Sequence, residues 1–402
     1  MEERVTEKTH HSTLARDGRF VSITLVSVLA TLGTNVVSPA LPAMADAMGV
    51  SDSRVGLVVS MYSVLAMVSV PFTGVISDIY GRRTVLLPSV FLFGLAGSAI
   101  AIVDSFETIL FLRAIQGVAY AAMMPITVAL LGDLYGGSKA STAQGLRVGA
   151  NGMGSAVVPI LAGFLAGLSW NYPFLLYLVA IPTLLIALFW LPEPSHSAIF
   201  DRGTWRTIRT YVRNLRNEAG QVNLRVLLFG EAVRDFIRYG LLTFVPLFAV
   251  RELGASVAVA GMVLSVRGVV YIGIGPVSGR IVAWFSRKRV LIGSLLISAT
   301  SIVLMPFSPS FVWLGALLGV YTIGDSLFSP VIKDAVTVIA SDERRGGIVS
   351  GMNMFKYGGQ ASSPVVFGAI LGLSEFSRIF FISALIAIVY ASLIFIYTDS
   401  SL

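Results

Sequence analysis

The chain contains no cysteine and only three histidines among its 402 residues. The absence of cysteine excludes disulfides and thiolate metal sites, and we predict no metal site of any kind. Charged residues are scarce as well: they make up 13% of the chain, whereas soluble domains carry about 25%. Hydrophobic residues reach 55%. This balance is typical of a protein that lies in a lipid bilayer.

Catalytic and nucleotide-binding motifs are missing too. The sequence has no HExxH, no GxSxG and no Walker phosphate loop, which mark zinc hydrolases, serine hydrolases and ATP-binding proteins. We therefore expect no enzyme and no cofactor, and a proton gradient rather than ATP as the energy source.

Twelve long apolar segments dominate the sequence instead. Crossing about 30 Å of hydrocarbon takes about 20 helical residues. The segments that reach this length cover approximately residues 20–43, 54–77, 84–103, 107–131, 142–168, 172–191, 224–250, 257–283, 290–307, 311–338, 346–371 and 376–397. We predict a transmembrane helix for each of them.

The positive charges between these segments predict their orientation, because cytoplasmic loops are rich in Lys and Arg. Basic residues gather at 4–19, 82–83, 139, 202–216, 287–289 and 344–345, all on the side of the N-terminus. The opposite loops hold little more than Arg54, Arg251 and Arg378. We expect a multi-pass protein of the cell membrane with both termini in the cytoplasm. Loop charges explain the net charge of +7 without a nucleic-acid partner.

The segments divide the chain into five regions. We expect a cytoplasmic tail at 1–19, a six-helix bundle at 20–191, a cytoplasmic linker at 192–223, a second six-helix bundle at 224–397 and a short cytoplasmic tail at 398–402. A plain solvated linker is one interpretation of 192–223. The other is an amphipathic helix on the membrane surface, because four apolar residues share one helical face: Trp205, Ile208, Val212 and Leu215.

The two halves repeat each other at an offset of about 205 residues. GVISDIYGRRTVLL (74–87) aligns with GRIVAWFSRKRVLI (279–292), and equivalent prolines and glycines follow at 125 and 330, 159 and 364, and 163 and 368. Six spans per half make the halves parallel repeats, the arrangement expected of alternating-access transporters with a site at the repeat interface. We predict an all-α membrane protein of twelve transmembrane helices in two pseudo-symmetric six-helix bundles.

GVISDIYGRR also satisfies the signature Gly-x-x-x-Asp-x-x-Gly-Arg-Arg, and in this position it resembles the loop between spans two and three of the major facilitator superfamily. RAIQG at 113–117 is similar to that family's Arg-x-x-Gln-Gly motif in span four. GMGSAVVPILAG at 152–163 resembles the antiporter motif of span five, although Val158 and Ala162 stand where glycines are expected. TNVVSPALP in span one is similar to the drug:proton antiporter branch. The antiporter-motif residues are Gly152, Gly154, Pro159 and Gly163.

The loop signature predicts a breakable latch on the cytoplasmic face that stabilises the outward-facing state. Gly74 would let helices cross closely, and Gly81 would adopt a turn conformation that other residues resist. Asp78 would accept N–H groups near the start of a helix or turn, and Arg82 would pair with Asp133. The alternative is that Arg82 and Arg83 only anchor the topology. The latch set is Gly74, Asp78, Gly81, Arg82, Arg83 and Asp133.

Ionisable groups inside a bilayer are costly and are candidates for function. Glu231, Asp235 and Arg238 share one face of span seven, and they form either a proton-coupling group or a static ion-pair network. Arg113 either binds an anion or satisfies backbone carbonyls. The residue that carries the proton stays open between three carboxylates. The candidates for coupling and substrate binding are Asn35, Arg113, Gln116, Glu231, Arg234, Asp235, Arg238, Arg267, Asp325 and Lys356.

These features predict a secondary active transporter, by resemblance a monomer, that works by alternating access. The leading hypothesis is export of a small organic molecule or drug in exchange for protons. The alternative is proton-coupled uptake or exchange of an organic anion, because the deep cations outnumber the deep acids and would attract anions. A receptor or scaffold that has kept a transporter fold is a third class, and the intact loop signature argues against it.

Overall fold

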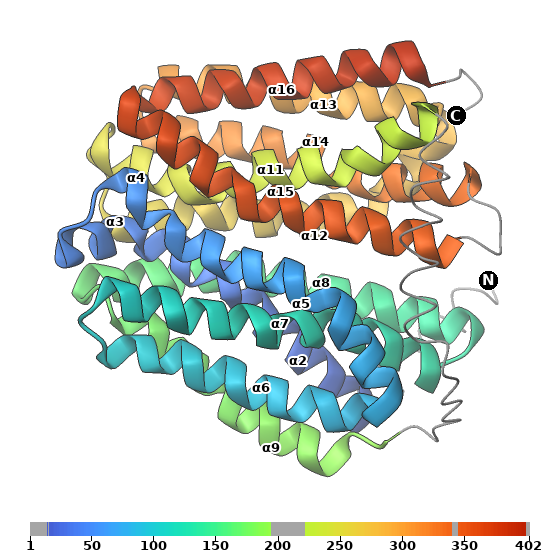
Figure 1. Ribbon diagram of the computed structural model, residues 1–402. Helices are drawn as coiled ribbons and strands as arrows, with labels where there is room; N and C mark the ends of the chain where they lie inside the picture. The colour runs from blue at the N-terminus through green and yellow to red at the C-terminus, as the bar shows by residue number, and fades with distance from the viewer. Residues whose placement is uncertain (1–13, 15, 194–221, 340–344, 399–402) are drawn as a thin grey trace.

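The computed structural model describes residues 14, 16–193, 222–339 and 345–398. The helices run roughly parallel to one another in two groups, with the blue-to-green N-terminal half below and the yellow-to-red C-terminal half above (Figure 1). Within the described residues every regular element is a helix. The part of the linker that carries the predicted amphipathic helix lies outside the described residues.

The N-terminal bundle begins with a span built from two consecutive helices, which meet at Val36. Its bounds are α2 (Gly18–Asn35), α3 (Val37–Met48), the short α4 (Asp52–Val55), α5 (Leu57–Tyr80), α6 (Arg82–Ala99), the 3-10 turn η1 (Ile100–Ile102), α7 (Phe106–Leu134), α8 (Gly137–Leu168), the 3-10 segment η2 (Tyr172–Val179) and α9 (Ala180–Trp190).

The C-terminal bundle repeats this order, with single helices, α11 and α16, where the first half has α2 with α3 and η2 with α9. Its bounds are α11 (Val222–Arg251), α12 (Val257–Trp284), α13 (Arg287–Leu304), the 3-10 turn η3 (Met305–Phe307), α14 (Phe311–Ile339), α15 (Arg345–Leu373) and α16 (Phe376–Tyr397). The equivalent prolines of the two halves lie inside equivalent helices, Pro125 in α7 and Pro330 in α14, Pro159 in α8 and Pro364 in α15.

Ten spans of the described chain are long and apolar enough to cross a membrane. The other two long helices, α11 and α15, pack against the rest of the C-terminal bundle and carry charged or small polar residues in their middle. The predicted class, an all-α membrane protein in two bundles, is confirmed.

Two pairs of long helices join the bundles: α8 packs along α12, and α5 along α15. Glycine brings the bundles close together beside both pairs. A Cβ at Gly163 of α8 would lie 2.9 Å from the carbonyl oxygen of Val257 in α12, and one at Gly368 of α15 would lie 2.4 Å from that of Ser53 in α4, the short helix before α5. Because these glycines are equivalent in the repeat, the two-fold relation of the halves extends to their interface.

Candidate functional site

The loop between α5 and α6 contains the signature GVISDIYGRR. Gly81 has φ of +100°, a conformation that L-residues with a side chain rarely adopt. Glu193, which follows α9, occupies the space beside it, and a Cβ on Gly81 would lie 2.6 Å from its carboxylate. The same carboxylate accepts hydrogen bonds from the backbone N–H of Arg83 (3.3 Å) and Thr84 (3.2 Å). It therefore caps the N-terminus of α6.

Two of the latch residues meet across helices. Arg82 Nε lies 2.6 Å from Asp133 Oδ2 at the end of α7, which is the pairing that the sequence suggests. Asp78 lies in the last turn of α5, next to the turn at Gly81. It accepts none of the expected N–H groups among the described residues, where its one contact is Arg82 at 3.9 Å. Its side chain is 70% exposed. Arg83 donates to the carbonyl of Leu188 at 2.7 Å and so binds the end of α9.

Gly74 does not serve the expected crossing in this conformation, because a Cβ placed there would meet nothing within 4 Å. The C-terminal half has a counterpart of the arginine pair: Arg287, the repeat equivalent of Arg82, lies 2.6 Å from Asp334 of α14. Ser286, which stands where Gly81 stands in the first half, caps α13 with its hydroxyl.

Arg113 of α7 is fully buried and bonded on all sides. Its Nε donates to the carbonyl of Val58 (2.9 Å), Nη2 to that of Gly33 (2.7 Å) and Nη1 to Gln116 Oε1 (2.7 Å). Gln116 in turn donates to the carbonyl of Phe93 (3.1 Å). The pair thus joins α2, α5 and α6 to α7, which favours the structural interpretation of Arg113 over anion binding.

The remaining predicted residues of the first half lie on α8 or contact it. Asn35 at the end of α2 donates to Ser155 of α8 at 3.1 Å. Gly154 faces α2 in the same bundle, whereas Gly152 faces Ile272 of α12. A Cβ on Gly261 of α12 would lie only 2.3 Å from the carbonyl oxygen of Pro159. The antiporter-motif residues therefore divide between the two sides of α8, and three of them lie at the bundle interface.

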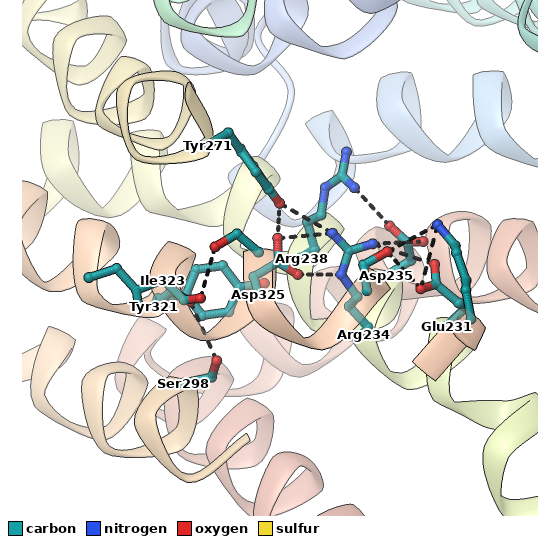
Figure 2. Close-up of polar contacts among 12 residues, drawn as sticks. Glu231, Arg234, Asp235, Arg238, Tyr271, Ser298, Tyr321, Ile323 and Asp325 are labelled. Atoms are coloured by element: carbon teal, nitrogen blue, oxygen red, sulfur yellow. Dashed lines mark hydrogen bonds and ion pairs between the residues drawn. The ribbon is translucent and has the colours of Figure 1, made fainter. Parts of the chain in front are cut away.

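Charged residues of α11 form a buried network with α12 and α14 (Figure 2). Arg234 donates to both oxygens of Asp325, from Nε at 2.6 Å and Nη2 at 3.2 Å. The hydroxyl of Tyr271 also donates to Asp325. This carboxylate is 1% exposed and fully paired, an arrangement that holds an ion pair together in a low dielectric. The contact of Tyr271 with this ion pair was not predicted from the sequence.

The two carboxylates of α11 itself, Glu231 and Asp235, have different surroundings. Glu231 accepts hydrogen bonds from Ser329 at 2.9 Å and from Arg234 at 3.5 Å. Asp235 is 0% exposed, and neither of its oxygens accepts a hydrogen bond among the described residues. Its nearest cations are Arg238 at 3.3 Å and Arg234 at 4.0 Å.

Three predicted cations have fewer partners. Arg238 contacts Asp235 with one nitrogen, and its Nε is buried without a hydrogen bond. Arg267 of α12 is 7% exposed, and its Nε lacks a partner within the described chain. Lys356 of α15 lies 5.3 Å from the ring centre of Tyr357.

An unpredicted cluster closes the interface at the end opposite the signature loop. Arg251, the last residue of α11, binds Asp46 of α3 (2.6 Å and 3.2 Å) and Asp52 of α4 (3.0 Å and 3.1 Å). We call these three residues the Arg251 clamp. The hydrogen bonds to Asp52 and then Asp46 raise the pKa of Arg251 above its usual value. Beside the clamp, α3 packs against α11 and α12, and α4 against α15.

Comparison with known proteins identifies the family. The family model of the Major Facilitator Superfamily matches residues 23–223 and 227–401. The chain belongs to this superfamily. The resemblance inferred from the loop signature is therefore confirmed, and the superfamily's members are transporters rather than enzymes.

Two curated relatives in the superfamily cover most of the chain. The bacillibactin exporter of Bacillus subtilis (strain 168) is 26% identical over 94% of this chain and 96% of its own length. The quinolone resistance protein NorA of Staphylococcus aureus is 21% identical over 84% and 86%. Both agree with the predicted drug:proton antiporter branch. The crystal structure of a D-xylose-proton symporter shares the fold, with a TM-score of 0.77 at 16% identity over 96% and 98%.

Proposed function

We propose that this transporter exports a small organic molecule in exchange for protons, by alternating access between its two bundles. The names of the two curated relatives, an exporter and a resistance protein, support export. The observation that carries proton coupling is Asp235, a buried carboxylate that accepts no hydrogen bond from the described residues. The proton gradient would be the only energy source, with no cofactor. The chain would act as a monomer in the cell membrane with both termini in the cytoplasm.

The surroundings of Asp235 favour it over the other two carboxylates as the proton carrier. A carboxylate in a low dielectric is costly when charged, unless hydrogen bonds or counter-ions compensate. Asp325 and Glu231 have such partners, and Asp235 depends mainly on Arg238. The charged and titratable groups around Asp235 are Arg234, Arg238 and Tyr239 of α11, Tyr120 of α7, and Lys356 and Tyr357 of α15. Arg238, at 3.3 Å, is the cation whose movement would change the charge balance at Asp235.

The two ends of the molecule would open alternately. The Arg251 clamp joins the bundles at one end, which the loop charges assign to the outside. The loop of the latch residues at the other end would contact the C-terminal bundle in the outward-facing state, when the clamp is broken, whereas the Arg82–Asp133 pair lies within the N-terminal bundle. Asp78 is exposed in this conformation, which supports the proposal that its contacts form only in the other one.

Transport in proteoliposomes under an imposed pH gradient tests the proposal. We expect a substrate of the wild type to move against its own gradient only while protons move the other way. Asp235→Asn should abolish this pH-driven movement and keep substrate exchange at equal pH, because exchange needs no net proton transfer. Asp104→Asn, which removes an exposed carboxylate outside the helices, is the matched control. Normal pH-driven transport by Asp235→Asn would refute the role of this residue.

A second candidate function is proton-coupled uptake or exchange of an organic anion. The observation that favours it is Arg267, a buried cation without a described counter-ion. The same proteoliposomes separate the two functions, because substrate and protons move together in uptake and in opposite directions in export.

A further inference from the structure

Three cations of the C-terminal bundle come from three helices. Arg238 lies on α11, Arg267 on α12 and Lys356 on α15. Arg267 makes no hydrogen bond or ion pair within the described chain, although it is 7% exposed. Lys356 has no carboxylate in contact there either, and Arg238 uses one nitrogen on Asp235. Arg238 and Arg267 both act electrostatically on Tyr239 and Tyr271, which places the two guanidinium groups in one neighbourhood.

A buried cation without a counter-ion is costly, because the attraction that would offset its desolvation is missing. The other deep arginines avoid this cost. Arg113 binds two carbonyls and Gln116, and Arg234 binds Asp325. The buried arginines with an unpaired nitrogen among the described residues, Arg238 and Arg267, therefore lie together. Asp325 acts on both but is already bound by Arg234, and a further anion would compensate the remaining positive charge.

Aromatic rings from both bundles lie next to these cations. Tyr120 of α7 contacts Tyr357 of α15 across the interface, with ring centres 6.4 Å apart, and Tyr62 of α5 lies 5.1 Å from Tyr120. Arg238 lies 5.6 Å from the ring centre of Tyr239. Ring faces and edges of this kind favour stacking with another aromatic ring.

We propose that the transported molecule is an organic anion that carries an aromatic ring. Its charged group binds Arg267 and Arg238, with Lys356 adding positive charge, and its ring packs against Tyr120 and Tyr357 at the bundle interface. This assignment rests on the proposed function, since it names the substrate class of the same site. A lipophilic cation is disfavoured there, because it would add charge of the sign already in excess.

Binding to the purified full-length protein in detergent tests the assignment, with isothermal titration calorimetry as the readout. The probes are 2-naphthoate, its neutral methyl ester, cyclohexanecarboxylate as an anion without an aromatic ring, and tetraphenylphosphonium as an aromatic cation. We expect 2-naphthoate to bind most tightly. Arg267→Gln should weaken it about tenfold or more, the size expected for one charge-assisted contact, and Arg267→Lys should restore part of the loss.

Arg289→Gln is the matched control, because it removes the same charge from an exposed position at the start of α13. Tyr120→Leu should reduce the advantage of 2-naphthoate over cyclohexanecarboxylate. Tighter binding of tetraphenylphosphonium, equal affinities of Arg267→Gln and Arg289→Gln, or no 2-naphthoate binding by folded protein would overturn the assignment.

The binding experiment tests the substrate class separately from the transport experiment. Binding of 2-naphthoate without pH-driven movement would refute the proposed function and leave the binding site. Proton-driven movement of other compounds by a protein that does not bind 2-naphthoate would refute only this assignment.

Discussion

Asp235 and Asp325 lie on neighbouring helices, α11 and α14, and both are buried, yet their environments differ. Arg234 binds Asp325 with two nitrogens, and Tyr271 adds a third donor. Asp235 accepts no hydrogen bond in the described chain. The sequence placed both carboxylates in spans but could not distinguish them, because Tyr271 and Asp325 reach α11 only through the tertiary fold.

The two carboxylates should therefore respond differently to amide substitution. Asp325→Asn leaves Arg234 buried without its main counter-ion and should destabilise the protein by about 3 kcal/mol or more. Asp235→Asn should cost less, because Asp235 accepts no hydrogen bond from the described residues and Arg238, its nearest cation, keeps 25% of its side chain exposed. Denaturation of the purified variants in the same detergent measures both effects. A larger loss of stability in Asp235→Asn would mean that Asp235 is a structural ion-pair partner.

Asp17 gives a pH prediction outside the spans. Its carboxylate accepts hydrogen bonds from Arg19 and Tyr135, and those from Arg19 above all lower its pKa to about 2. Because the pKa is lower in the folded state than the ordinary value of 3.8, its stabilising effect is fully present above pH 4 and is lost as the pH falls towards 2. Asp17→Asn should thus lower thermal stability by the same amount at pH 5 and pH 8. A difference that changes between these pH values would contradict the assignment.

At the scale of helices, the interface of α8 and α12 depends on glycine. A Cβ on Gly268 would lie 2.1 Å from the backbone nitrogen of Ala156, and one on Gly261 would lie 2.3 Å from the carbonyl oxygen of Pro159. The repeat aligns Gly163 with Gly368 in the sequence, and the fold places both at the bundle interface. For Arg113 the sequence left backbone carbonyls and an anion as alternatives, and it could not name the carbonyls, because they belong to segments 55 and 80 residues away.

Gly268→Leu should separate α8 from α12 and slow transport at least tenfold, whereas Gly167→Leu should have little effect, because nothing lies within 4 Å of a Cβ there. Both variants change the same residue type inside or at the end of a long helix. Initial transport rates, normalised to the amount of protein in the membrane, measure the effect. Equal rates would show that close packing of these two helices is dispensable.

At the scale of the whole molecule, the described conformation is joined at the clamp end. Arg251 binds Asp46 and Asp52, which lie 205 and 199 residues away in the sequence. No local sequence pattern predicts such a pairing. The bundle architecture, in contrast, followed from hydropathy and the repeat, because both are properties of long segments. Glu193, which caps α6 from beyond α9, was missed for the same reason as the clamp.

Breaking the clamp should favour opening at that end. Partly exposed ion pairs contribute about 1 kcal/mol, so Arg251→Gln should change the ratio of closed to open molecules about fivefold. Because the chain has no cysteine, spin labels attach only to the introduced pair Ser51→Cys and Glu252→Cys. Electron paramagnetic resonance then measures one distance between the bundles. Arg378→Gln is a control for loss of a positive charge on the same side. An unchanged distance distribution in Arg251→Gln would show that the clamp does not hold the bundles together.

In the proposed mechanism, protonation of Asp235 shifts the balance between the two bundle arrangements. The Ser51→Cys and Glu252→Cys label pair in liposomes, measured at pH 5 and pH 8, tests it directly. We predict that the proportion of closed molecules changes between these pH values in the wild-type background and stays constant when Asp235→Asn is added. A pH response that survives Asp235→Asn, or no response in either protein, would contradict the account.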